Sequence, residues 1–100
     1  METFQQLIDG DTPVLVDFYA DWCGPCKAME PTIKEVAGII SGKTRVIKLD
    51  IDRNQPTAGK YNVQAVPTFI LFRKGKEIWR HPGMIDKKSL LSVLNEYTVK

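Results

Sequence analysis

The feature that most constrains this 100-residue chain is an apolar run at residues 14–20, followed closely by a pair of cysteines. The run, VLVDFYA, is almost unbroken in apolar and β-branched residues, which is typical of a strand buried on both faces in a parallel sheet. Asp17 is the exception within it. Cys23 and Cys26, the only cysteines of the chain, then fall where a helix is predicted to begin. Such a strand needs helices on both of its faces, so the pattern favours an α/β fold.

Apolar periodicity and turn residues predict the other elements. Helices are predicted at residues 3–8, 23–40, 57–61 and 85–97, and further strands at residues 45–51, 68–72 and 77–80. Pro31 should kink the second helix, and Asp86 should cap the last one. The order predicts two parallel strands with a right-handed crossover and a hairpin beside them. The result is a mixed four-stranded sheet flanked by helices on both faces.

Composition is that of a soluble globular protein, and residues 1–100 are expected to form a single domain. Apolar residues make up 43% of the chain and the net charge is only +2, with short basic groups, so no nucleic-acid contact is expected. The longest apolar stretch, residues 66–72, is too short to cross a membrane. The N-terminus does not resemble a signal peptide, which predicts a cytoplasmic protein. A chain trimmed of its signal peptide would look the same, so a periplasmic location stays open.

The two cysteines have three candidate roles: zinc ligation, a structural disulfide, or thiol–disulfide exchange. Zinc needs about four ligands, and the chain adds only His81, which has no matching spacing and is expected to be exposed. A disulfide closing so short a ring would contribute little chain-entropy stabilisation. Exchange is favoured because the helix N-terminus stabilises a Cys23 thiolate, with Cys26 one turn away on the same side. Pro25 fits the first turn, and Gly24 allows close backbone approach.

In this setting, WCGPCK at residues 22–27 resembles the active-site motif of the thioredoxin family. The resemblance covers nearly the whole chain and includes VDFYADWCGPC, Pro31, KLDID (residues 48–52), AVPTF (residues 65–69), Gly75 and Gly83. It implies the thioredoxin fold without the family's N-terminal edge strand. It also implies a monomeric, general protein disulfide reductase that a thioredoxin reductase re-reduces. Its substrates would be disulfide-containing proteins, and the chain itself would bind no cofactor and no metal.

The resemblance further implies roles for four residues. Cys23 would be the nucleophile and Cys26 the resolving cysteine. Asp17 would be the general base and acid for Cys26, with its charge modulated by Lys48 on the adjoining strand. Burial of a carboxylate in an apolar strand is costly, so the pKa of Asp17 should be raised towards neutrality. Read without the resemblance, Lys48 could be plain surface charge.

A substrate-docking patch is also implied, consisting of Trp22, Gly24, Pro25, Val66, Pro67, Gly83 and Met84. The Val66–Pro67 bond would be cis and lie against the cysteines, leaving the backbone of Val66 free to pair with an extended substrate. Base rates alone would favour a trans bond. Three departures from the family affect this region: Tyr19 in place of a common tryptophan, the segment RHP at residues 80–82, and Met84. They place partner choice in doubt.

Two other functions stay open. One is an extracytoplasmic disulfide oxidant or isomerase. Gly-Pro between the cysteines favours reduction instead, because a histidine in that dipeptide stabilises the thiolate of the oxidising relatives. The other is a thioredoxin-fold binding subunit with idle cysteines. The predicted burial of Asp17 argues against it, since a binding module does not require a buried carboxylate.

Overall fold

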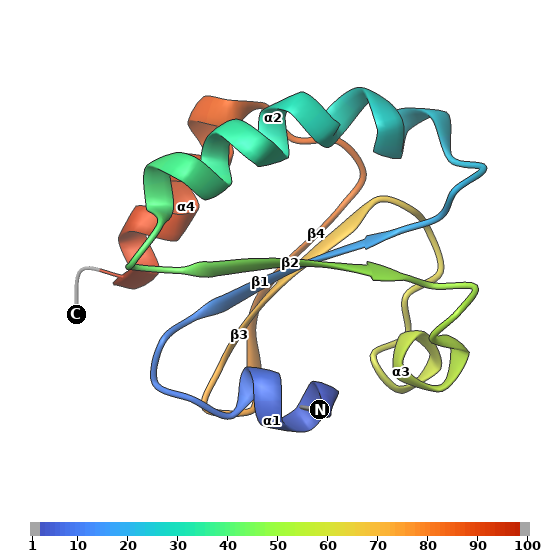
Figure 1. Cartoon of the computed structure of the whole chain (residues 1–100), viewed down its shortest axis with the longest axis horizontal. Helices are drawn as coiled ribbons and strands as arrows, with labels where there is room; N and C mark the ends of the chain where they lie inside the picture. Colours follow the sequence, from blue (N-terminus) through green and yellow to red (C-terminus); the bar gives the residue numbers. More distant parts are fainter. Residues whose placement is uncertain (1–2, 99–100) are drawn as a thin grey trace.

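The computed structural model, which describes residues 3–98, contains a mixed four-stranded sheet between two layers of helices (Figure 1). The strand order is β2-β1-β3-β4; β1 and β2 are parallel, and the other two neighbouring pairs are antiparallel. Along the chain the elements are α1 (Phe4–Ile8), β1 (Val14–Tyr19), α2 (Gly24–Ile40), β2 (Arg45–Asp50), α3 (Gln55–Lys60), β3 (Thr68–Arg73), β4 (Lys76–Pro82) and α4 (Lys87–Thr98). The sequence predicts this order and this sheet, and both predictions are confirmed.

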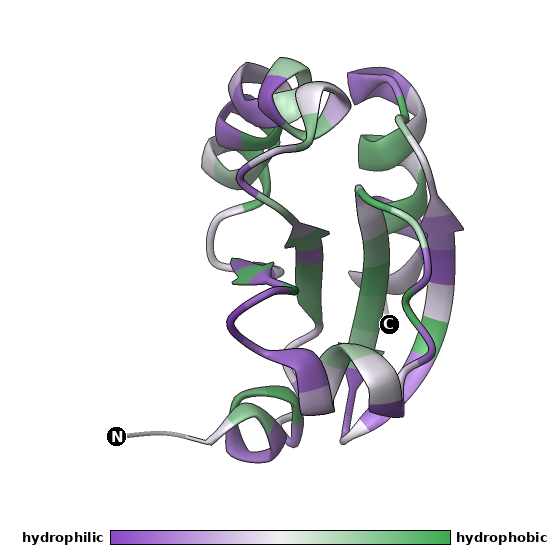
Figure 2. Cartoon of the chain, turned by 90° about the vertical axis from the view of Figure 1, so that its right-hand side faces the viewer, coloured by the Kyte–Doolittle hydropathy of each residue, from purple (hydrophilic) through white to green (hydrophobic). Residues whose placement is uncertain are grey.

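Strand β1 lies at the centre of the core because both of its faces are buried. Leu15 faces α2 and α4 and packs among Met29, Ile33, Val36, Ile40, Leu90 and Leu94. Val14, Val16 and Phe18 face the opposite side, where Ile8 of α1 covers them. Figure 2 shows the hydrophobic residues concentrated along the inner strands. Asp17 has the same parity as Leu15, so it points towards the α2 side of the sheet.

Element ends differ slightly from the predictions. Helix α3 begins earlier than predicted because Pro56 fits its first turn. Strand β4 extends to Pro82, which is tolerated there because β4 is an edge strand. Asp86 accepts a hydrogen bond from the backbone N–H of Ser89 at 3.0 Å, which confirms the predicted cap of α4. Helix α2 continues through Pro31 without ending, and the kink stays a prediction.

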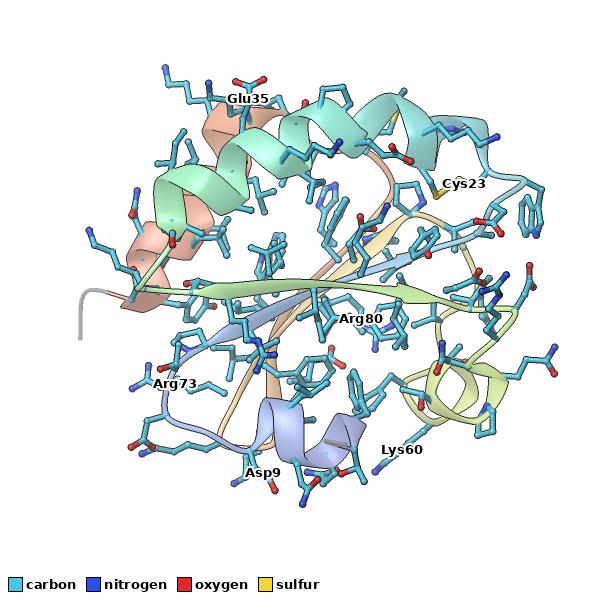
Figure 3. The ribbon with its side chains drawn as sticks, in the orientation of Figure 1. Asp9, Cys23, Glu35, Lys60, Arg73 and Arg80 are labelled. Atoms are coloured by element: carbon cyan, nitrogen blue, oxygen red, sulfur yellow. A yellow bond between two sulfur atoms is a disulfide. The ribbon has the colours of Figure 1, made fainter. Side chains whose placement is uncertain are left out.

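Three connections meet at one end of the sheet. Strands β1 and β3 are antiparallel, so the loop that leaves β1 lies beside the loop that enters β3. The end of β4 joins them, since Pro82 pairs with Thr68. Figure 3 shows Cys23 at this end of the molecule, where α2 begins. Within residues 3–98, no helix has both the length and the apolar character needed to span a membrane.

Candidate active site

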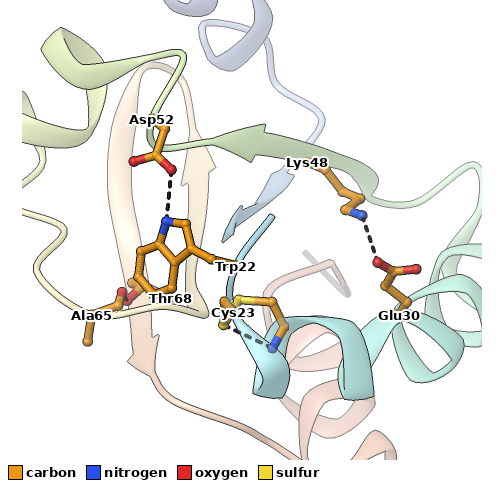
Figure 4. Close-up of a disulfide and its surroundings, with 8 residues drawn as sticks. Trp22, Cys23, Glu30, Lys48, Asp52, Ala65 and Thr68 are labelled. Carbon is orange, nitrogen blue, oxygen red and sulfur yellow. Dashed lines mark hydrogen bonds and ion pairs between the residues drawn. A yellow bond between two sulfur atoms is a disulfide. The ribbon is translucent and has the colours of Figure 1, made fainter. Parts of the chain in front are cut away.

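Cys23 and Cys26 form a disulfide at the N-terminus of α2, with their Cα atoms 5.3 Å apart (Figure 4). Cys23 is the N-cap residue, and its Sγ accepts the backbone N–H of Cys26 at 3.1 Å. Gly24 and Pro25 form the exposed first turn between the two buried cysteines. A reduced Cys23 would therefore have an N–H group and the positive end of the helix dipole directed at its sulfur. Both favour the thiolate.

The loop before β3 supplies the opposite wall of the site. Val66 is half-buried and packs against the buried cluster formed by Ala20, Cys23 and Cys26. The Val66–Pro67 bond is cis, as the resemblance implies. The carbonyl of buried Pro67 accepts the backbone N–H of Gly83 at 2.7 Å, and Gly83 has a φ of 91°, a conformation that favours glycine. The structure thus brings Val66, Pro67 and Gly83 together beside the disulfide.

The large exposed side chains of the predicted patch are Trp22, 69% exposed, and Met84, 54% exposed. The indole Nε1 of Trp22 donates to Oδ2 of Asp52 at 2.9 Å (Figure 4). The carbonyl of Met84 lies 3.1 Å from Nε2 of His81, whose ring stacks on Trp79. His81 is half-buried, so the prediction of an exposed side chain is wrong. The contact between Trp22 and Asp52 could not be predicted from local sequence, because the two residues are 30 positions apart.

Asp17 is buried, with only 4% of its surface exposed. Burial raises the pKa of its carboxyl from 3.8 to about 6; the positive charge of Lys48 lowers the pKa, and the negative charge of Glu30 raises it. Among the described residues, its Oδ1 atom has no hydrogen-bond partner. The predicted rise in the pKa is therefore confirmed. A carboxyl that titrates near neutral pH can both accept and donate a proton.

Lys48 lies opposite Asp17 in the register of β1 and β2. Its ammonium is 3.9 Å from the carboxylate of Glu30 and 4.4 Å from the centroid of the Tyr19 ring. A pocket of about 170 Å³ is lined by Asp17, Glu30, Ile33, Lys34, Ala37, Val46 and Lys48. Sequence reasoning missed Glu30. Its position four residues after Cys26, on the same face of α2, was the signal that could have found it.

Comparison with known proteins decides the family. A sequence model described as Thioredoxin matches residues 1–96. The chain belongs to the thioredoxin family. It is 40% identical to a thioredoxin of Rickettsia conorii over 92 residues, which are 92% of this chain and 88% of that protein. It is 45% identical to one of Staphylococcus epidermidis over 83 residues, or 83% and 80% of the two chains. A solved thioredoxin variant from Halobacterium salinarum superposes with a TM-score of 0.86 at 36% identity, covering 100% of this chain and 89% of that one.

Family membership and the Cys23–Cys26 pair together establish the activity. This member of the thioredoxin family is a thiol–disulfide oxidoreductase with the activity of a protein disulfide reductase. Its family acts on disulfide substrates and draws on a reductase partner. Within residues 3–98, no three or more His, Cys, Asp or Glu side chains are grouped as a metal site would require.

Proposed function

We propose that this protein is a general, monomeric disulfide reductase of the cytoplasm in which Cys23 is the nucleophile. The observation that carries the proposal is the position of the Cys23 sulfur at the N-cap of α2, where it accepts the N–H of Cys26. The Cys23 thiolate attacks one sulfur of a substrate disulfide, forming a mixed disulfide and releasing the other sulfur as a thiolate. Cys26 then attacks the Cys23 sulfur. The second substrate thiolate leaves, and the Cys23–Cys26 disulfide holds the oxidising equivalents.

Asp17 is the proton acceptor for Cys26 in the second step. Cys26 must lose its proton to attack, and a carboxyl with a pKa of about 6 is a far better base than an ordinary carboxylate. Position supports the assignment. Asp17 points towards α2, and Glu30, one turn after Cys26, lines the same pocket as Asp17. In the reverse direction, the protonated carboxyl returns the proton to Cys26.

Substrate docks on the patch around the disulfide, which consists of Trp22, Gly24, Pro25, Val66, Pro67, Gly83 and Met84. The exposed side chains of Trp22 and Met84 offer apolar contact to a substrate. An extended substrate segment pairs with the backbone of Val66, beside Pro67, which has no N–H to donate. Lys48 tunes the charge of Asp17 from the adjoining strand.

The electron donor is a thioredoxin reductase, which returns the Cys23–Cys26 disulfide to the dithiol. The chain itself carries no cofactor for this step. The alternative of an extracytoplasmic oxidant predicts a different reduction potential. Titration of the disulfide against dithiothreitol should give a strongly reducing value, and a value near that of strong oxidants, roughly −120 mV, would exclude the reductase proposal.

A trapping experiment tests the assignment of the nucleophile. The Cys26→Ser variant should accumulate a stable mixed disulfide with a disulfide-containing test protein, because the resolving thiol is gone. Cys23→Ser is the matched control, since it also leaves one thiol but removes the proposed nucleophile. Non-reducing electrophoresis with mass spectrometry reads out the adduct. Equal trapping by both variants, or trapping by Cys23→Ser alone, would contradict the assignment.

The role of Asp17 has its own test. Asp17→Asn should slow resolution of the mixed disulfide at neutral pH while changing the attack by Cys23 less, because the amide cannot accept the proton of Cys26. Rapid-mixing kinetics that separate the two steps provide the measurement. Equal slowing of both steps would refute a specific role in resolution.

A further inference from the structure

The Lys48 ammonium forms its ion pair with Glu30 and not with Asp17, its partner in the sheet. Lys48 and Asp17 are partners in the parallel register of β1 and β2, so their side chains lie on the same face of the sheet, where opposite charges attract. The ammonium instead lies 3.9 Å from the carboxylate of Glu30 (Figure 4). It also lies over the ring of Tyr19. Oδ1 of Asp17 has no hydrogen-bond partner among the described residues. The Lys48 ammonium therefore lies beside Glu30 and Tyr19 and makes no hydrogen bond to Oδ1 of Asp17.

Glu30 is placed to hold it there. It belongs to α2, lies one turn after Cys26, and lines the pocket that also contains Asp17 and Lys48. Its side chain and that of Lys48 are each nearly half exposed, at 47% and 42%, so their contact lies at the solvent side of the pocket, whereas Asp17 is buried. The contact thus keeps the positive charge at the mouth of the pocket.

Among residues 3–98, three other charged side chains line the pocket that contains Asp17. Lys48 comes from β2, and Glu30 and Lys34 come from α2. Cys26, also on α2, lies one turn before Glu30. On the β3 side the register partner of Asp17 is Phe69, which is apolar. Of these groups, Lys48 lowers the pKa of Asp17 and Glu30 raises it, so the position of the Lys48 ammonium bears directly on the Asp17 carboxyl.

We propose that Glu30 is a positioning residue for proton transfer by Asp17: its carboxylate holds the Lys48 ammonium at the pocket mouth and prevents an ion pair with Asp17. The inference rests on the proposed role of Asp17 in resolution. It adds that Glu30 keeps the Asp17 carboxylate a strong enough base for that role. Without Glu30, the flexible Lys48 side chain can turn inward and stabilise the ionised Asp17. Asp17 then becomes a weaker base towards Cys26, because an ion-paired carboxylate binds a proton less tightly.

Glu30→Gln tests the proposal, with Glu35→Gln as the matched control. Glu35 lies on the same helix and also pairs with a lysine, Lys87, at 2.9 Å, but it does not line the pocket. The titration of the Asp17 carboxyl is followed by carbon NMR in the oxidised protein. Loss of Glu30 should move its midpoint down by about 0.5 to 1 pH unit, because a negative charge is lost and the ammonium is freed. The control should leave the midpoint unchanged. An unmoved midpoint in Glu30→Gln, or equal shifts in both variants, would overturn the proposal.

A second background separates positioning from the plain charge of Glu30. In Lys48→Met there is no ammonium to hold, so adding Glu30→Gln should shift the midpoint clearly less than it does with Lys48 present. An undiminished shift would show that Glu30 acts directly on Asp17 and would refute the positioning role. The pH profile of resolution should follow the same midpoints. If Asp17→Asn does not slow resolution, the proposed function of Asp17 fails, while the NMR midpoints still judge the role of Glu30.

Discussion

Replacing Asp17 by asparagine should stabilise the oxidised protein at neutral pH and leave it nearly unchanged in acid. The pKa of this carboxyl is 3.8 ordinarily and about 6 in the folded protein, because burial disfavours its charged form. Between these values the folded chain holds a proton that the unfolded chain has lost, so stability falls as the pH rises from 3.8 to 6. Above pH 6 the full difference applies, and it amounts to about 3 kcal/mol. Asparagine has nearly the same shape and carries no charge, so it escapes this loss.

Urea unfolding of both oxidised proteins, at intervals from pH 4 to pH 8, measures the effect. The variant should gain little at pH 4, and its advantage should grow to about 3 kcal/mol by pH 7 to 8. Asp11→Asn is the control: that side chain is 91% exposed, so removing its charge should change stability little at any pH. A gap between wild type and Asp17→Asn that stays constant across the range would refute the reasoning, because it would show that ionisation of Asp17 is not what destabilises the fold.

Three further predictions concern the scaffold, each read from equilibrium unfolding. Gly75→Ala should destabilise the protein by at least about 1 kcal/mol, because φ is 79° there and the added Cβ would lie 2.7 Å from Oδ1 of Asp9. Gly38→Ala is the control: the added Cβ lies in open space within α2, so the change should stabilise the protein by about 0.5 to 1 kcal/mol. Leu94→Ala should cost about 2 to 5 kcal/mol, since the side chain is fully buried; a smaller loss would contradict the core described for α4. Asp86→Ala should lower the unfolding midpoint at pH 7, because hydrogen bonds of the helix cap lower the pKa of this carboxyl. The difference between wild type and variant should shrink as the pH falls below 3.8. A difference that does not depend on pH would show that the charged cap is not its cause.

The fold was predictable because its signals are local. The run at residues 14–20 identifies the central strand through burial on both faces, and helical spacing identifies α2 and α4. The errors occur at element ends. Pro56 and Pro82 both extend their elements beyond the predicted limits, since a proline is accepted in the first turn of a helix and on an edge strand. Turn residues alone do not show whether a helix or strand stops before a proline or includes it.

The site was predictable only where it is local or resembles the family. Cys23 and Cys26 follow from spacing. The cis bond before Pro67 follows from the resemblance alone, because base rates favour a trans bond. Glu30 and Asp52 were missed for a different reason. Each meets its partner from another element, and the final approach depends on rotamers that no sequence pattern encodes.

The position of the Lys48 ammonium affects stability and the proposed chemistry of Asp17 in opposite directions. A direct ion pair with Asp17 would reduce the free-energy cost of the buried charge, but it would also lower the pKa of Asp17 and weaken it as a base. In the proposed mechanism, the contact between Lys48 and Glu30 favours chemistry over stability. The ammonium lies near enough to lower the pKa of Asp17 somewhat, and its ion pair is with Glu30. Two properties should therefore change together in Glu30→Gln. The protein should become more stable above pH 6 and resolve mixed disulfides more slowly, and a variant that gained stability with no loss of rate would break this link.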